Sequence, residues 1–533
     1  MWRRCEILTD QLRACVSERA IPGALREEWN NSAIRSISVA DEICERTLQY
    51  SSPMVIRARH TAHAGCGLLI LACAGQLAAC VHFQPKPLSA AASLTGFESR
   101  SLEAPGLRAF LQANQVTAPA AEAAWSLEAL TLTAVYYQPA LAEARTRLLA
   151  AQAGRITADE RPNPSIAVTP GYDAGVPGAV HPWIVPLSFD WPIETAGKRR
   201  YRLAEAQHLA AAARWDLVGA VWRARSRLRA ALLEVYAAQR AESLLRREES
   251  TRQEAVRLLQ GQLEAGNVSS YEVAEARIAW DRTTLAKQAA AGQLRQSRIA
   301  LAGALGVPLR ALDGVRLSFL DLQSVPLDLT RPQVRQEALL DRADVRGALE
   351  LYAASQSALQ LQIARQWPDI ELGPGFEWNP QLAGDREWDL GLALPLPVRN
   401  RNQGPIAQAK AQRALAAAHF LTVQTAAVTE IDGSLAAYDS ARAQLMTADA
   451  LLRGLEQQLG SVNAQVAAGE LQALDLANAR LAYEAGLREQ LDALVHAQRA
   501  LGRLEDATQS PLTLARTTVR AAQPPINMRA SNP

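Results

Sequence analysis

Cysteine is missing from the chain after position 80. The 6 cysteines lie at Cys5, Cys15, Cys44, Cys66, Cys73 and Cys80. The chain after Cys80 can therefore form no disulfide among its own residues and no thiolate metal site. If the segment before Cys80 is removed, Cys80 is the only cysteine of the mature protein.

Aromatic residues and net charge are also low. Aromatic residues make up 5% of the chain, and the formal net charge is +2. No basic stripe with interleaved aromatic residues is present, which argues against nucleic acid as a main partner. Alanine, by contrast, is abundant. This composition favours long, closely packed helices over an ordinary mixed domain.

Motifs of catalysis and cofactor binding are absent as well. The chain has no G-x-G-x-x-G or Walker loop, no H-E-x-x-H and no cluster of cysteine with histidine. The histidines after Cys80 are scattered: His82, His181, His208, His419 and His496. Lone histidines of this kind are usually packed in a core or solvated rather than bound to a metal. We therefore expect no catalytic residues, no cofactor and no metal site.

Proline is missing from two long stretches, residues 193–307 and 406–510. One plausible turn interrupts each stretch, at Gly266 and at Gly469. Residues 198–264 are predicted to form one helix of roughly 100 Å, at 1.5 Å per residue. A return helix of about half that length follows each turn.

The two turns lie in segments that are copies of each other. Leu263 to Arg277 reads LEAGNVSSYEVAEAR, and Val466 to Arg480 reads VAAGELQALDLANAR. The aligned pairs are Gly266 with Gly469, Glu272 with Asp475, and Arg277 with Arg480. A glycine at matching places in two long helical runs indicates a helical hairpin built twice.

Two strand patterns precede each long helix, over 165–169 and 183–191 in the first half and over 369–378 and 388–394 in the second. Apolar residues alternate in them, and tryptophan lies near their ends, at Trp183, Trp191, Trp378 and Trp388. This pattern is typical of membrane β-strands with interfacial aromatics. Pro186 counts against it, because proline cannot donate a ladder hydrogen bond.

Outside these elements, helices are predicted over 127–154 and 337–365 from apolar spacing. Residues 82–119 are interpreted as an extended lead-in, and the tail after Pro511 as disordered. Each half then has the order helix, strand, strand, very long helix, tip, half-length helix.

The segment before Cys80 has the features of a signal. Basic residues after Met54 precede a short apolar run at 67–75, and Leu77-Ala78-Ala79-Cys80 resembles the lipobox of bacterial lipoproteins. Residues 54–79 are predicted to be a lipoprotein signal peptide and Cys80 the site of lipid (palmitate) attachment. The alternative is a plain secretory signal. Residues 1–53 are then either an over-extended start or a genuine extension.

The order of elements and the duplicated tips resemble the outer membrane factor family, the TolC-like exit ducts of Gram-negative efflux and secretion systems. The resemblance implies a mainly α fold with a small membrane β-barrel portion. It divides the chain into a lipid-anchored lead-in at 80–126, repeats at 127–330 and 331–510, and a tail at 511–533. The stretch at 194–200 is similar to the heavy-metal efflux branch, but the cargo stays open among metal cations, drugs and solvents.

The strands favour an oligomer. Four strands cannot close a barrel, and lipid does not tolerate open strand edges. Three copies give twelve strands, an even number within the known range. The family resemblance implies a homotrimer in the outer membrane, with periplasmic helices in an α-barrel. It also implies two partners, a periplasmic adaptor and an inner-membrane transporter such as an RND pump.

The resemblance also assigns candidate sites. The tips, Gly266-Asn267 and Gly469-Glu470, are expected at the periplasmic end, where they would dock the adaptor. The family position of a pore constriction falls on Glu272 and Asp475, with Glu275 as a weaker second ring. Capping is the alternative role for these acids, since Ser269-x-x-Glu272 is a capping box, whereas Asp475 has no serine partner.

A second class of function is a periplasmic coiled-coil adaptor or scaffold lipoprotein without a pore. An adaptor would carry a single hairpin flanked by other β-domains. The doubled hairpin, with two membrane-type strands in each copy, favours the passive channel.

Overall fold

The computed structural model describes residues 83–116, 124–172, 174–175, 182–326, 339–379 and 385–512. Its contacts divide the chain into two units, Met1–Pro87 and Leu88–Pro533. Cys80 and the predicted signal lie outside the described residues, so the architecture below is that of the second unit.

The two hairpins form as predicted, and together they make up most of the second unit. The first consists of α8 (Lys198–Glu264) and α9 (Ser270–Leu305), and the second of α12 (Gln403–Ala467) and α13 (Ala473–Thr508). Proline is absent from α8, α9 and α13, and glycine follows the C-cap of both α8 and α12. The helices therefore run without interruption to their tips.

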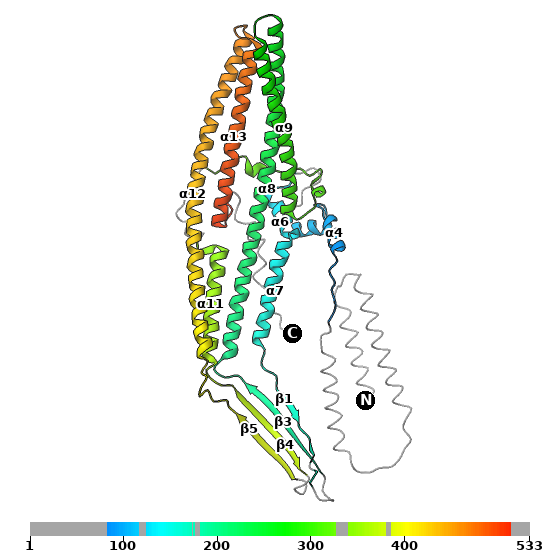
Figure 1. The fold of residues 1–533 in the computed structure, drawn as a ribbon, viewed down its shortest axis with the longest axis vertical. Helices are drawn as coiled ribbons and strands as arrows, with labels where there is room; N and C mark the ends of the chain where they lie inside the picture. Colours follow the sequence, from blue (N-terminus) through cyan, green and yellow to red (C-terminus); the bar gives the residue numbers. More distant parts are fainter. Residues whose placement is uncertain are drawn as a thin grey trace, which may run out of the picture. The chain divides into compact units, whose positions relative to one another are not determined.

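The helices form a layer of four columns (Figure 1). Helix α8 contacts α7 (Pro139–Asp159) and α9 on one side and α11 (Ala343–Ala364) and α13 on the other. Helix α12 contacts α11 and α13. The column order is thus α7 with α9, then α8, then α11 with α13, then α12. In the first and third columns two short helices follow each other along one long neighbour (Figure 1).

In each repeat, the two short helices of one column are together nearly as long as the long helix beside them. Helices α7 and α9 have 21 and 36 residues beside the 67 of α8, and α11 and α13 have 22 and 36 beside the 65 of α12. At 1.5 Å per residue, each long helix extends about 100 Å. Two short helices can therefore cover one long helix along most of its length.

The strands form one antiparallel sheet in the order β1-β3-β4-β5, with β2 paired to β3 beside β1. Their bounds are β1 Ser165–Val168, β2 Gly171–Tyr172, β3 Trp183–Ile193, β4 Ile370–Asn379 and β5 Asp385–Ala393. The predicted first strand forms as β1, and β2 lies just beyond the predicted range and pairs with the same strand, so that β1 and β2 fill one place in the sheet. Strand β3 forms despite Pro186, which is level with Glu377 of β4. The Pro186 carbonyl accepts a hydrogen bond from the Thr169 N–H at 3.3 Å.

The predicted helix over 127–154 is two helices, α6 (Leu127–Tyr137) and α7. Proline at position 139 starts α7, because its missing N–H suits a first helical turn but not a helix interior. At this break the Gln138 side-chain amide donates to the carbonyls of Gly303 and Ala304 at 2.8 and 2.5 Å. The break therefore caps the C-terminus of α9.

The prediction of an extended lead-in was wrong. Residues 82–119 contain α4 (Ala90–Glu98) and α5 (Pro105–Ala113). Leu107 and Leu111 of α5 are fully buried, one turn apart. Tertiary packing of this short apolar stripe, rather than helix propensity, explains the helix.

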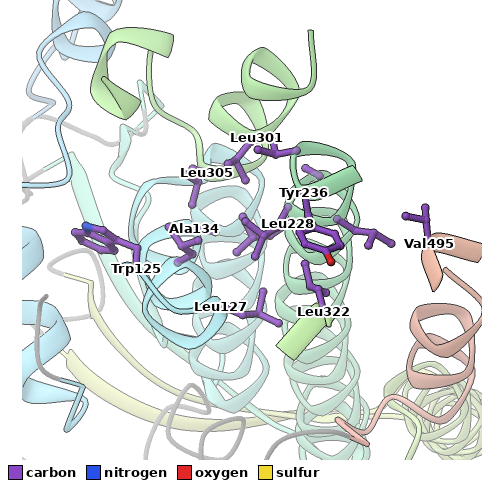
Figure 2. Close-up of a cluster of buried hydrophobic side chains, with 14 of the residues drawn as sticks. Trp125, Leu127, Ala134, Leu228, Tyr236, Leu301, Leu305, Leu322 and Val495 are labelled. Atoms are coloured by element: carbon purple, nitrogen blue, oxygen red, sulfur yellow. The ribbon is translucent and has the colours of Figure 1, made fainter. Parts of the chain in front are cut away.

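The main apolar core lies where the two repeats meet midway along the layer. Figure 2 shows side chains from α6, α8, α9 and α13 converging there, with Leu228 and Leu301 at no exposure. The short helix η3 (Leu320–Leu322) adds Leu322, and Tyr236 packs against Phe319 with ring centroids 5.4 Å apart. The segment after α9, which also contains η2 (Leu309–Leu312), thus closes the core from one side.

A buried ionic network joins α8 to α13 near this core. The Glu505 carboxylate lies 3.1 Å from Arg225 and 3.4 Å from Arg229, and all three side chains are almost completely buried. Asp506 accepts hydrogen bonds from Trp222 at 3.0 Å and from Ser226 at 2.5 Å. Burial lowers the pKa of Arg229 and raises that of Asp506. Removing one partner would leave an uncompensated buried charge, so the network fixes the two repeats in one arrangement.

Candidate functional site: hairpin tips and strand face

The two tips have the same backbone geometry. Gly266 has φ +75° and Gly469 has φ +81°. In the first tip, Gly266 N–H donates to Leu263 O at 2.9 Å and Asn267 N–H to Gln262 O at 2.9 Å. This pair of bonds is a Schellman motif, which needs a left-handed residue after the C-cap.

The second tip repeats these bonds. Gly469 N–H donates to Val466 O at 3.1 Å, and Glu470 N–H donates to Gln465 O at 2.9 Å. A Cβ at either glycine would meet no atom within 4 Å. Glycine is therefore required by its backbone angle rather than by lack of space.

Both return helices begin with a capping box. The Glu272 carboxylate accepts a hydrogen bond from Ser269 N–H at 2.7 Å, as predicted. The Asp475 carboxylate accepts from Gln472 N–H at 2.9 Å, and the Gln472 side chain in turn accepts from the Asp475 N–H. Asp475 has no serine partner, as expected, but the Gln472 side chain performs the capping role that Ser269 has in the first tip.

The three candidate carboxylates at the tips are exposed, and two of them, Glu272 and Asp475, cap a helix at the same time. Glu272, Glu275 and Asp475 all lie on the exposed surface. The Tyr271 hydroxyl donates to Glu275 Oε1 at 3.1 Å, and this bond raises the pKa of Tyr271. Capping and an exposed negative charge are therefore compatible in the same side chains.

The two tips contact each other directly. Gln262 Nε2 donates to Gln472 Oε1 at 2.8 Å, which links the end of α8 to the start of α13. The sequence did not single out either glutamine. The signal would have been the duplication itself, since Gln472 occupies the position of the capping Ser269.

One face of the sheet is almost entirely apolar, and we call it the strand face. The strand register places these side chains on it: Ile166, Val168, Trp183, Val185, Leu187, Phe189, Trp191, Leu372, Pro374, Phe376, Trp378, Trp388, Leu390 and Leu392. Many are uncovered, with Trp191 53% and Leu390 71% exposed. An apolar patch of this extent indicates a membrane or protein contact.

The opposite face of the sheet is polar and acidic. It carries Asp190, Glu371, Glu377, Glu387 and Asp389. Glu377 and Glu387 are directly opposite on neighbouring strands. Like charges in this position repel each other unless water surrounds them. The alternation of an apolar with a polar face matches strands that separate lipid from water.

The predicted interfacial tryptophans lie at different levels of the sheet. Trp183 and Trp191 are at opposite ends of β3, about 27 Å apart at 3.4 Å per residue. Trp378 is level with Val185, and Trp388 is level with the middle of β3 through Phe376. In a barrel strand tilted by about 40°, the distance between Trp183 and Trp191 corresponds to a membrane thickness of about 20 Å, somewhat less than an apolar band of about 25 Å.

Comparison with known proteins decides the family. The profile of the outer membrane efflux protein family matches residues 133–307 and 334–509, twice along one chain. The chain belongs to the outer membrane efflux protein family. The duplication predicted from the tips is thereby confirmed, as is the expectation that the protein is a transport duct rather than an enzyme.

One curated relative is the cobalt-zinc-cadmium resistance protein CzcC of Cupriavidus metallidurans. It is 24% identical over 320 residues, which cover 58% of this chain and 75% of CzcC.

Solved structures share the fold. VceC of Vibrio cholerae matches with a TM-score of 0.58 at 19% identity, over 72% of this chain and 95% of its own. The channel OprN matches with a TM-score of 0.60 at 19% identity, over 80% and 98%. CusC matches with a TM-score of 0.58 at 18% identity, over 72% and 91%.

Within the described ranges, no group of three or more histidine, cysteine, aspartate or glutamate side chains is arranged to hold a metal ion. Helix α12 alone among the described helices is long and apolar enough by composition to cross a membrane. Only 11% of its most apolar segment of 18 residues is buried. At 65 residues it is far longer than the roughly 20 that a bilayer requires. Its apolar surface is therefore better explained as a contact face.

Proposed function

We propose that the protein is the trimeric outer-membrane exit duct of a tripartite efflux system. It provides a passive path for small molecules or ions across the outer membrane. An inner-membrane transporter of the RND class and a periplasmic adaptor would deliver the cargo. Membership of the outer membrane efflux protein family supports this role.

One observation supports the trimer above all: the helix layer and the sheet are open along the same two edges. The first column contains α7, which leads into the edge strand β1, and the last column is α12, which follows the edge strand β5. A neighbouring copy placed against one edge would therefore continue both layers at once. Three copies would close twelve strands into a barrel without free edges.

The exposed surface of α12 agrees with such a neighbour. Leu415 is 71% exposed, Leu421 58% and Met446 56%. These apolar side chains lie on the helix at the open edge of the layer, where a second copy would cover them. The strand face would then contact lipid, and the acidic face would line the water-filled interior.

The tips would form the periplasmic mouth. Gly266-Asn267 and Gly469-Glu470 would meet the adaptor, and Glu272, Asp475 and Glu275 would supply rings of carboxylates that favour cations. Cys80 would carry the lipid anchor after removal of residues 54–79. CzcC is named for resistance to cobalt, zinc and cadmium, which makes divalent metal ions the first cargo to test.

The decisive experiment combines mass and conductance. The purified protein in detergent is expected to have the mass of three chains and to give discrete single-channel currents in planar bilayers. A monomeric mass without any current would instead support the adaptor or scaffold alternative.

A further inference from the structure

We propose that each seam between neighbouring copies binds the phosphate headgroup of an anionic phospholipid through Arg161 of one copy and Arg399 and Arg401 of the next. The inference rests on the proposed trimer. The three arginines lie at the junction between the sheet and the helices.

All four connections between sheet and helices leave from one end of the sheet (Figure 1). Three basic residues there form ion pairs within the chain. Lys198 Nζ lies 2.7 Å from Asp369 Oδ1, Arg199 lies 2.7 Å from Asp159 Oδ1, and Arg202 pairs with Glu194. Two of these ion pairs hold the start of α8 to residues that flank β4 and β3, and the third joins it to the end of α7.

Three other arginines near this end of the sheet are not neutralised by the residues that the structure describes. Arg161, Arg399 and Arg401 are exposed, and among the described residues their guanidinium groups have no hydrogen bond or ion pair. Arg161 has one acidic neighbour, Glu160, whereas the sequence from Leu390 to Thr429 contains no aspartate or glutamate. Among the described residues, no acid forms an ion pair with Arg399 or Arg401.

The sheet order places these arginines on opposite edges. Arg161 immediately precedes β1, which is one edge strand, and Arg399 and Arg401 follow β5, which is the other. Strand β1 runs away from the helices and β5 runs toward them, so closing the ring through an antiparallel β1–β5 contact brings both sets to one seam. Three arginines would then meet at one seam, and a bound anion would relieve their repulsion.

The surroundings select a phospholipid rather than a small anion. Leu396 is 70% exposed and Val398 is 74% exposed, immediately before Arg399. The apolar strand face continues from them along β5. A phospholipid satisfies both features, because its phosphate pairs with arginine in a fork geometry and its acyl chains cover the apolar side chains.

The test is native mass spectrometry of the intact detergent-purified protein, titrated with dioleoylphosphatidylglycerol or dioleoylphosphatidylcholine. We expect up to three phosphatidylglycerol molecules per trimer and at least tenfold weaker binding of phosphatidylcholine. Arg399→Ala with Arg401→Ala, and separately Arg161→Ala, should each weaken phosphatidylglycerol binding about tenfold. Arg399→Lys with Arg401→Lys keeps the charge and should bind more tightly than the double alanine variant.

The matched control is Arg295→Ala with Arg453→Ala, which removes two exposed arginines from α9 and α12 away from the junction. It should bind phosphatidylglycerol like the parent. Equal binding of both lipids, no effect of Arg161→Ala, a lysine variant as weak as the alanine one, or displacement of the lipid by millimolar inorganic phosphate would each overturn the seam site. A trimer without lipid preference leaves the proposed function standing, whereas a monomer removes both.

Discussion

Gln262 and Gln472 connect the two hairpin tips through a single hydrogen bond of 2.8 Å between side-chain amides. Gln262 lies in the last turn of α8 and Gln472 is the N-cap residue of α13. The contact therefore crosses from the first repeat to the second at the end where the proposed duct opens.

Replacing Gln262 with alanine should make the mouth easier to open. The loss of one exposed neutral hydrogen bond is worth about 0.5–1 kcal/mol, or about a two- to fivefold shift toward the open tips. Single-channel recordings should show a higher open probability, with unchanged thermal stability of the whole protein. The control is Gln465→Ala, the equivalent position in the second tip, whose side chain makes no hydrogen bond within the described residues. An equal effect of both substitutions would count against the tip contact.

Two glycines of the same hairpin should respond in opposite directions to alanine. Gly266→Ala forces a side chain into a left-handed backbone and should destabilise the tip by about 1–2 kcal/mol. Gly261→Ala, inside α8 with open space around it, should stabilise by about 0.5–1 kcal/mol. Hydrogen exchange of the tip amides measures both changes locally. An unchanged or stabilised tip in Gly266→Ala would contradict the role of its left-handed backbone.

The tip carboxylates should set ion preference. Glu272→Gln combined with Asp475→Asn removes both charges but leaves oxygens that can still accept the capping hydrogen bonds. Reversal potentials in a salt gradient should then shift toward lower cation preference. Glu275→Gln alone should have a smaller effect, and an unshifted double variant would reject a role in the constriction.

A half-buried carboxyl between the hairpins should make stability depend on pH. Burial raises the pKa of Glu484 above its ordinary 4.5, and the negative charge of Glu248 raises it further, against Arg247, Arg252 and a bond from Thr251. A raised folded-state pKa means that the favourable contribution is complete below pH 4.5 and is lost as the pH rises through the folded value.

Glu484→Gln imitates the protonated form, so it should increase stability by about 1 kcal/mol at neutral pH and lose that advantage below pH 4.5. Thermal unfolding followed by circular dichroism at the two pH values measures this. Glu489→Gln, an exposed change on the same helix, serves as the control and should have no effect at either pH.

The sequence predicts the long elements well and the long-range contacts poorly. Helix α8 has the predicted bounds, because Gly197 and Gly266 stop it and proline is absent between them. The cap by Gln472 was missed, because glutamine is not among the usual N-cap residues. The pairing of Arg225 with Glu505 joins positions 280 residues apart, which no local pattern indicates.

Matched column lengths restrict how this protein can change in size. Two short helices must together reach as far as one long neighbour if the strands are to stay level and the tips are to meet. An insertion of one turn into α8 alone would push its tip about 5 Å beyond that of α12 and break the Gln262–Gln472 contact. A longer or shorter duct therefore requires simultaneous insertions or deletions at the same height in all four columns, so the repeats can change length only together.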